Sequence, residues 1–166
     1  MSRGATHRAL YFAYGSNLSV VRLQARVASA RVHCRAWLDG HRVSFGKLGR
    51  DGSGKATLVE AAGERAWGAV YTIDPSHWAE LDRFEPGYQR IVITLTTESN
   101  GPLVATTYRA PETAPDPTAF ASYKQTVIAG AIEHALPGAY IDWLRRLPER
   151  PDPFTSDAPP ACEPPR

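Results

Sequence analysis

The segment 10–18 constrains the fold more than any other part of the sequence, because an apolar run stops there in a Gly-Ser-Asn turn. The first four residues of the segment are too few for a surface helix and are typical of a buried strand. Gly15 permits backbone angles that a Cβ would exclude. Ser16 and Asn17 are residue types that favour a helix N-cap, and residues 19–27 carry apolar side chains at helical spacing. The sequence therefore predicts a strand, a tight turn and a helix in direct succession.

A turn of this kind has two interpretations. Its unpaired backbone N–H groups point the same way, so they can bind a carboxylate or a developing oxyanion without a cationic side chain. The same residues also fit an ordinary helix start that binds nothing. Ser16 is disfavoured as a hydrolase nucleophile, because Gly-Ser-Asn lacks the Gly-x-Ser-x-Gly elbow and the five histidines show no placement that fits a triad.

Composition limits the classes of partner. The chain has 166 residues and a formal net charge of +2, which fits one globular domain and does not favour nucleic acid or an anionic membrane as a partner. A small neutral or mildly anionic ligand is more natural. No apolar run approaches the roughly 18 to 20 residues of a membrane span, and residues 1–8 lack the apolar region of a secretory signal. These features predict a cytoplasmic protein.

The two cysteines favour neither a disulfide nor a metal site. A disulfide would join Cys34, in a strand-like segment, to Cys162, in a proline-rich end, so free thiols are expected. Cys34 has no CxxC partner, and the neighbouring His33 alternates to the other side of a shared strand. We therefore expect no bound metal.

The rest of the chain alternates between predicted strands and helices. Residues 31–45 are expected to form two strands joined by a hairpin turn at Asp39-Gly40, and residues 46–55 a flexible loop that lacks the features of a phosphate-binding loop. Further strands are predicted at residues 56–60, 66–73, 88–97 and 103–110. Helices are predicted at residues 74–84, with Asp74 as N-cap, and at residues 119–135 and 139–147.

The hairpins predict an α+β fold, in which a mostly antiparallel, curved sheet forms a small closed or nearly closed barrel with flanking helices. This domain is expected to occupy residues 1–147. Residues 148–166 are rich in proline and poor in apolar side chains, so they are predicted to be a disordered tail.

Glu85 is unusual for a surface glutamate. It lies where the helix from Pro75 is expected to end, and an anion at that end of the helix dipole is unfavourable by up to about 1 kcal/mol. Its aromatic neighbours Phe84 and Tyr88 predict an apolar setting, which also disfavours the ionised form. Both effects raise the pKa of Glu85 toward the range of a general base near neutral pH. A solvated glutamate beside a turn is the alternative that the local pattern leaves open.

Three stretches carry a family resemblance, namely Tyr14-Gly15-Ser16-Asn17-Leu18, Leu81-Asp82-Arg83-Phe84-Glu85-Pro86-Gly87-Tyr88, and Tyr123-Lys124 with Gly130-Ala131 and Leu136-Pro137. In sequence and order they resemble the gamma-glutamylcyclotransferase family, also known for its AIG2-like fold. The resemblance covers roughly residues 8–147. The resemblance implies the same α+β barrel.

The resemblance also implies a reaction. Members of the family let the alpha-amine of a gamma-glutamyl substrate attack its own gamma-carbonyl, which forms 5-oxoproline and releases an amino acid or an amine. Glu85 matches the catalytic glutamate, and Tyr123 matches a substrate-contacting tyrosine. The substrate carboxylate and carbonyl oxygen would bind to the backbone of Tyr14, Gly15, Ser16, Asn17 and Leu18. No cofactor is implied, whereas a homodimer and a place in glutathione metabolism are.

One departure from the family pattern concerns the glutamate. Members usually carry glycine directly after it, whereas here Pro86 stands between Glu85 and Gly87 and the connection to Tyr88 is short. Pro86 restricts the backbone of Glu85, so the pocket wall formed by this loop can differ from that of other members. The sequence therefore does not determine which leaving group is preferred. The alternatives are a relative that acts on gamma-glutamyl amines or on a larger gamma-glutamyl-protected amine, and a non-enzymatic binder of a small acidic metabolite.

Overall fold

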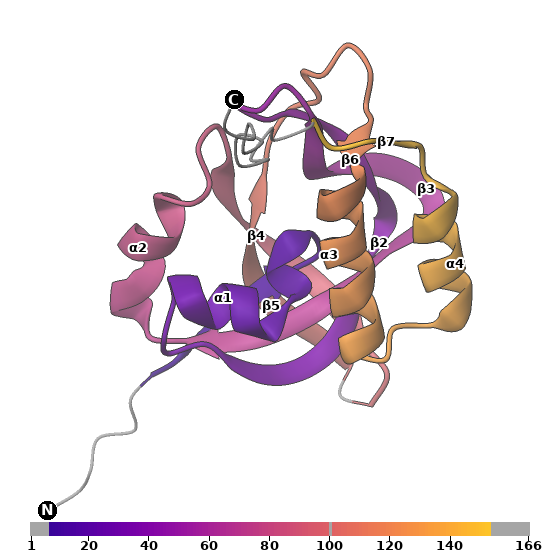
Figure 1. Cartoon of the computed structure of the whole chain (residues 1–166). Coiled ribbons are helices and arrows are strands. Elements are labelled where there is room, and N and C mark those ends of the chain that lie inside the picture. The colour runs from indigo at the N-terminus through magenta and orange to yellow at the C-terminus, as the bar shows by residue number, and fades with distance from the viewer. Residues whose placement is uncertain (1–6, 100, 154–166) are drawn as a thin grey trace, which may run out of the picture.

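The computed structural model describes residues 7–99 and 101–153, and its centre is a closed five-stranded barrel (Figure 1). The strands follow the order β1-β3-β2-β4-β5 around the barrel. They are β1 (Ala9–Ala13), β2 (Arg31–Leu48), β3 (Gly54–Ile73), β4 (Gln89–Thr97) and β5 (Gly101–Arg109). Neighbouring strands are antiparallel except β1 and β5, which pair in parallel at Tyr11 and Thr106. The predicted α+β barrel is therefore confirmed.

Helices cover the outside of the barrel. The helical segments are η1 (Ser16–Leu18), α1 (Val20–Arg26), η2 (Pro75–His77), α2 (Trp78–Asp82), α3 (Ala121–Glu133) and α4 (Gly138–Arg146). In Figure 1, α1 and α3 lie in front of the barrel, with α2 at the left and α4 at the right. None of the helices within residues 7–99 and 101–153 has the length and apolarity that crossing a membrane would require.

The hairpin predicted at Asp39-Gly40 is wrong, because β2 continues through this position. β2 pairs with β3 on both sides of it, with Asp39 opposite Arg65 and His41 opposite Glu60. Gly40 has a φ of 69° and coincides with a shift of register. A glycine in the left-handed region therefore bends one long strand here instead of reversing the chain.

Two other predictions for the β2–β3 pair are also wrong, because the strands are longer than expected. The expected strands 56–60 and 66–73 are parts of the single strand β3. Half of the expected flexible loop 46–55 is strand, and the other half is a short turn in which the N–H of Gly49 donates to the carbonyl of Ser53 at 2.8 Å. The β2–β3 turn is thus a hydrogen-bonded element.

The helix after β3 begins as predicted. The side chain of Asp74 accepts a hydrogen bond from the backbone N–H of Ser76, and Pro75 occupies the first turn. The helix ends at Asp82, earlier than expected, so Glu85 belongs to the following turn.

A small parallel sheet pairs β6 (Ala119–Phe120) with β7 (Glu149–Arg150), which lies beyond the predicted domain boundary at residue 147. Beyond it, Asp152 accepts a hydrogen bond from the backbone N–H of Ser122 at 3.0 Å. Residues 154–166 of the predicted tail, including Cys162, lie outside the described residues.

The packing of α3 against η1 depends on Gly130. A Cβ on Gly130 would lie 2.5 Å from the Cβ of Leu18 and 2.9 Å from the backbone nitrogen of Ser19. Real Cβ atoms do not approach other atoms this closely, so a side chain here would push α3 away from the turn that follows β1.

We expect Gly130→Ala to lower the free energy of unfolding by about 1 to 2 kcal/mol, because overpacking against backbone exceeds the gain in helix propensity. Gly138→Ala, in α4, is the matched control, since nothing lies within 4 Å of the added Cβ. Urea denaturation measures both variants. A Gly130→Ala protein as stable as Gly138→Ala would contradict this packing argument.

Candidate active site

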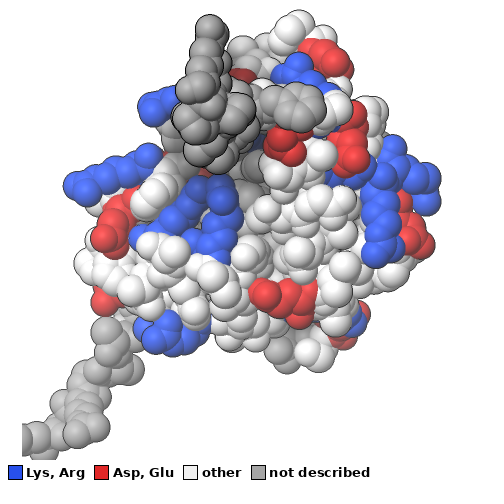
Figure 2. All heavy atoms as spheres, in the orientation of Figure 1, with Lys and Arg blue, Asp and Glu red and all other residues white. Residues whose placement is uncertain are grey.

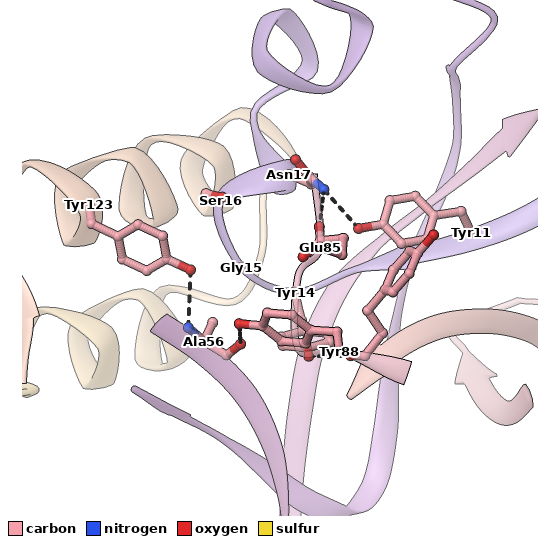
Figure 3. A pocket seen from close by; sticks show the side chains of 10 residues that line it. Tyr11, Tyr14, Gly15, Ser16, Asn17, Ala56, Glu85, Tyr88 and Tyr123 are labelled. Carbon is pink, nitrogen blue, oxygen red and sulfur yellow. Dashed lines mark hydrogen bonds between the residues drawn. The ribbon is translucent and has the colours of Figure 1, made fainter. Parts of the chain in front are cut away.

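A pocket opens where η1 meets the turn after α2 (Figure 3). The residues that line it come from β1, η1, β3, β5, α3 and the turn after α2, and they are Tyr11, Tyr14, Gly15, Ser16, Asn17, Ala56, Glu85, Tyr88, Tyr108 and Tyr123. Glu85 is the acidic residue in this set. Among the described residues, no group of three or more His, Cys, Asp and Glu side chains is placed to hold a metal ion.

The turn after β1 presents backbone N–H groups to this pocket. Those of Gly15, Ser16 and Asn17 have no acceptor within residues 7–99 and 101–153. The prediction that Ser16 or Asn17 caps the following helix is wrong, because Ser19 is the N-cap of α1. The donors at the start of η1 therefore remain available to an anion.

Gly15 is needed for a reason that the sequence did not show. Its φ is −112°, so a positive φ is not what requires glycine here. A Cβ at this position would lie 2.9 Å from the Cβ of Ala56 and 3.4 Å from the hydroxyl of Tyr123. The missing side chain lets β3 and α3 approach the turn and close one wall of the pocket.

Glu85 is held by a tight turn. The N–H of Tyr88 donates to the carbonyl of Glu85 at 3.1 Å, with Pro86 and Gly87 between them. Gly87 has a φ of 82°. Proline followed by a glycine with positive φ is typical of a type II β-turn. Pro86 thus fits a regular turn and fixes the backbone that carries the carboxylate.

A hydrogen-bond network places Asn17 against Glu85. Its Nδ2 donates to Oε1 of Glu85 at 3.0 Å and to the hydroxyl of Tyr11 at 3.1 Å, as Figure 3 shows. Its Oδ1 accepts from Nη1 of Arg26 at 3.2 Å. Because a guanidinium can only donate, Arg26 fixes the orientation of the amide and directs Nδ2 toward the carboxylate.

Burial raises the pKa of Glu85 from 4.5 to about 7, although Arg26 and the hydrogen bond from Asn17 act in the opposite direction. The raised pKa agrees with the expectation from sequence, and its main cause, burial, is one of the two that were expected. Tyr88 lines the pocket with Glu85, whereas Phe84 does not. Phe84, which was expected to supply the apolar setting, is 45% exposed and packs on the guanidinium of Arg26. Enclosure by the pocket is what disfavours the ionised form.

The tyrosines of the pocket do not titrate near neutral pH, unlike Glu85. Burial raises the pKa of each of them above the ordinary range, so they stay protonated near neutral pH. The hydroxyl of Tyr88 donates to the carbonyl of Ala56 at 2.7 Å, and the hydroxyl of Tyr14 donates to the carbonyl of Tyr108. The hydroxyl of Tyr123 accepts from the N–H of Ala56 at 3.1 Å and also forms a hydrogen bond with the side chain of Ser16.

The family described as "Gamma-glutamyl cyclotransferase, AIG2-like" matches residues 11–125. The chain belongs to this family. Its curated relatives include a Bos taurus gamma-glutamylcyclotransferase, 31% identical over 79% of this chain and 74% of the relative, and a Homo sapiens gamma-glutamylcyclotransferase, 31% identical over 83% and 78%.

A solved structure named gamma-glutamyl cyclotransferase superposes on this AIG2-like chain with a TM-score of 0.80 and 28% identity. The superposition covers 90% of this chain and 92% of the other. The similarity therefore includes the barrel and the helices around it, and the family resemblance seen in the sequence is confirmed.

The structure brings most of the residues expected from the family motif into one pocket. Tyr14, Gly15, Ser16, Asn17, Glu85 and Tyr123 all line it. Leu18 does not, because its side chain is fully buried in the core and its N–H donates to the carbonyl of Gly15 at 3.0 Å.

Three lining residues were not expected from the sequence, namely Tyr11, Ala56 and Tyr108. Tyr88 was expected only as an apolar neighbour of Glu85, and it also closes the turn that carries this residue. Ala56 and Tyr108 come from other strands of the cyclotransferase-like barrel, and no local pattern identifies them.

We expect Asn17→Ala to raise the pKa of Glu85 further above 7, because the variant removes a hydrogen bond that favours the carboxylate. NMR titration of the Glu85 carboxyl carbon measures this shift. Ser19→Ala is the control: it removes the N-cap of α1 without touching the pocket, so it should destabilise the protein and leave the pKa unchanged. Equal pKa values in both variants would contradict the role of Asn17.

Proposed function

We propose that this chain is a gamma-glutamyl cyclotransferase that converts a gamma-glutamyl amide to 5-oxoproline and a free amino acid or amine, with Glu85 as general base and acid. The observation that carries the proposal is a carboxyl with a pKa of about 7, hydrogen-bonded to Asn17 and facing a turn with unpaired N–H donors. Membership of the cyclotransferase family supports the same reaction.

Glu85 handles the protons of the reaction. Its carboxylate takes a proton from the alpha-ammonium of the substrate, and the free amine then attacks the gamma-carbonyl carbon. The new C–N bond closes a five-membered ring. Glu85 returns the proton to the departing nitrogen as the amide C–N bond breaks, which restores the carboxylate. The ring nitrogen gives its second proton to the released amine, which leaves as an ammonium, so the product is the neutral lactam. A pKa near 7 suits both steps, because both protonation states are populated at neutral pH.

The turn after β1 binds the negatively charged groups of the substrate. The free N–H groups of Gly15, Ser16 and Asn17 can donate to the alpha-carboxylate and to the oxygen of the tetrahedral intermediate. Tyr123, which stays protonated near neutral pH, lines the same region. These donors are fixed before the substrate binds, so little reorganisation accompanies the reaction.

Positioning supplies much of the acceleration. Nucleophile and carbonyl belong to one molecule, and holding it in a ring-like conformation is worth about 7 kcal/mol or more in favourable cases. The chemistry assigned to this pocket needs a base and fixed donors and requires no cofactor. The tyrosine walls of the pocket restrict the conformations of a bound glutamyl chain.

A non-enzymatic binder is the second candidate. The free N–H donors alone could hold a small acidic metabolite, and such a binder would not need a carboxyl with a pKa near 7. The partly buried Glu85 favours catalysis, because an ionised carboxylate would repel an acidic ligand.

Release of 5-oxoproline, followed by mass spectrometry, tests the proposal. The panel contains gamma-glutamyl dipeptides and gamma-glutamyl amines. We expect product from at least one class. If folded protein gives no 5-oxoproline but free glutamate raises its melting temperature, the binding function replaces the enzymatic one.

Three further features stay predictions, namely the cytoplasmic location, the homodimer and the division between the domain and its tail at residue 147. Size-exclusion chromatography with light scattering tests the homodimer. Activity of a chain ending at Pro153, the last described residue, tests whether the remaining tail contributes.

A further inference from the structure

A second cavity of about 300 Å³ adjoins the active-site pocket and shares Ser16, Glu85, Tyr88 and Tyr123 with it. If the glutamyl part of the substrate occupies the inner pocket, as proposed above, the leaving group extends into this second cavity, which we call the vestibule. Its lining therefore bears on the choice of leaving group.

The vestibule is strongly basic. Its lining includes Arg22, Arg26, Lys47, Arg50 and Lys55. The acidic residues of the lining are Asp51 and Glu85, so cations exceed anions by 5 − 2 = 3 when Glu85 is ionised. Figure 2 shows Lys and Arg side chains gathered on the face over α1, beside a hollow in the surface. This local excess contrasts with the nearly balanced charge of the whole chain.

Three of these cations already have partners. Nη1 of Arg26 donates to Asn17, Nζ of Lys47 donates to the carbonyl of Pro86 at 2.9 Å, and Nζ of Lys55 lies 2.8 Å from Oδ2 of Asp51. The two lysines also lie over the pocket tyrosines, with Nζ of Lys47 5.1 Å from the ring centre of Tyr88 and Nζ of Lys55 4.6 Å from that of Tyr123. They frame the opening between pocket and vestibule.

Arg22 and Arg50 differ from these three. Within the part of the chain that the structure describes, their guanidinium groups have no hydrogen-bond or ion-pair partner. Each guanidinium can bind one carboxylate through two parallel hydrogen bonds. Two unpaired guanidiniums at one cavity fit a leaving group that carries two carboxylates.

We propose that the vestibule is a leaving-group subsite that selects gamma-glutamyl dipeptides whose second residue is acidic, with Arg22 and Arg50 as the specificity-determining residues. A leaving amino acid with an acidic side chain presents two carboxylates, a neutral amino acid presents one, and a simple amine presents none. The order of preference follows the number of carboxylates. This inference rests on the proposed cyclotransferase function.

The test compares kcat/KM for gamma-glutamyl-glutamate, the isosteric gamma-glutamyl-glutamine and gamma-glutamyl-propylamine at low ionic strength. We expect the wild type to prefer gamma-glutamyl-glutamate over gamma-glutamyl-glutamine about fivefold, the scale of an exposed ion pair. The difference should lie mainly in KM and should shrink as salt is added.

The double variant Arg22→Gln, Arg50→Gln is expected to lower this preference to about one. Both side chains are exposed, so the fold should persist, and circular dichroism checks it. Arg146→Gln is the matched control, because Arg146 is an exposed arginine of α4 that lies outside the vestibule. It should keep the wild-type preference.

A second variant, Arg50→Glu, should shift the preference toward gamma-glutamyl-lysine. Equal kcat/KM for the glutamate and glutamine substrates in the wild type, or an unchanged ratio in the double variant, would overturn the subsite while the proposed function stands. Absence of 5-oxoproline from every substrate would overturn the proposed function and the subsite with it.

Discussion

Glu85→Gln is expected to lower kcat for 5-oxoproline release by about a thousandfold, the scale of general acid–base catalysis by a positioned side chain. Glutamine has nearly the same shape and can still accept the hydrogen bond from Asn17. It cannot take a proton from the alpha-ammonium or return one to the leaving nitrogen. The loss should therefore appear in kcat, with a smaller change in KM.

Glu80→Gln is the control for this experiment, because Glu80 is an exposed glutamate on α2 that does not line the pocket. It should retain wild-type activity. If Glu85→Gln keeps more than about a tenth of the wild-type activity, the rate contribution of this carboxyl is well below that of a general acid–base catalyst. The proposed mechanism would then be wrong.

The same carboxyl is expected to make the wild-type protein less stable as the pH rises. Its pKa is about 7 in the folded state against 4.5 as the ordinary value, so between these values the folded state holds a proton that the unfolded state has lost. Stability therefore falls through this window. The contribution of the Glu85 proton to the free energy of unfolding is complete below pH 4.5. Above pH 7 the free energy of unfolding is lower by about 3 kcal/mol, because the folded state has also lost this proton.

Urea denaturation of the wild type and Glu85→Gln at pH 4.5 and pH 8 measures this effect. Other titrating groups are common to both proteins and cancel in the comparison. The wild type should lose about 3 kcal/mol relative to the variant over this range. If the free energies of unfolding of the wild type and Glu85→Gln change equally between pH 4.5 and pH 8, the raised pKa of Glu85 is contradicted. A loss of this size means that the base destabilises the fold at the pH where it works.

Much of the fold could be predicted because its signals are local. The apolar run that ends at Gly15, the cap at Asp74 and the alternation along β4 each report on their own neighbours in the chain. The bend at Gly40 could not be predicted, because Asp-Gly has the same local signature in a hairpin turn and in a bulge. Only the pairing of β3 along the whole of β2 distinguishes them.

The site was predictable to the extent that it lies in short motifs. The turn after β1 and the Glu85 turn are contiguous stretches, so family resemblance could assign them. Tyr108 and Ala56 reach the pocket only because the barrel closes. The vestibule combines cations from α1 with Lys47 of β2, Arg50 of the β2–β3 turn and Lys55 of β3, so no sequence pattern groups them.

The pH dependence of kcat/KM for 5-oxoproline release tests the central claim, that Glu85 acts as the base with a pKa near 7. The profile should rise with pH and level off with a midpoint of about 7, since only the ionised carboxyl can accept the proton. In Asn17→Ala the midpoint should move upward. A rate that stays constant down to pH 5 would show that no group with this pKa controls the reaction and would contradict the assignment of Glu85.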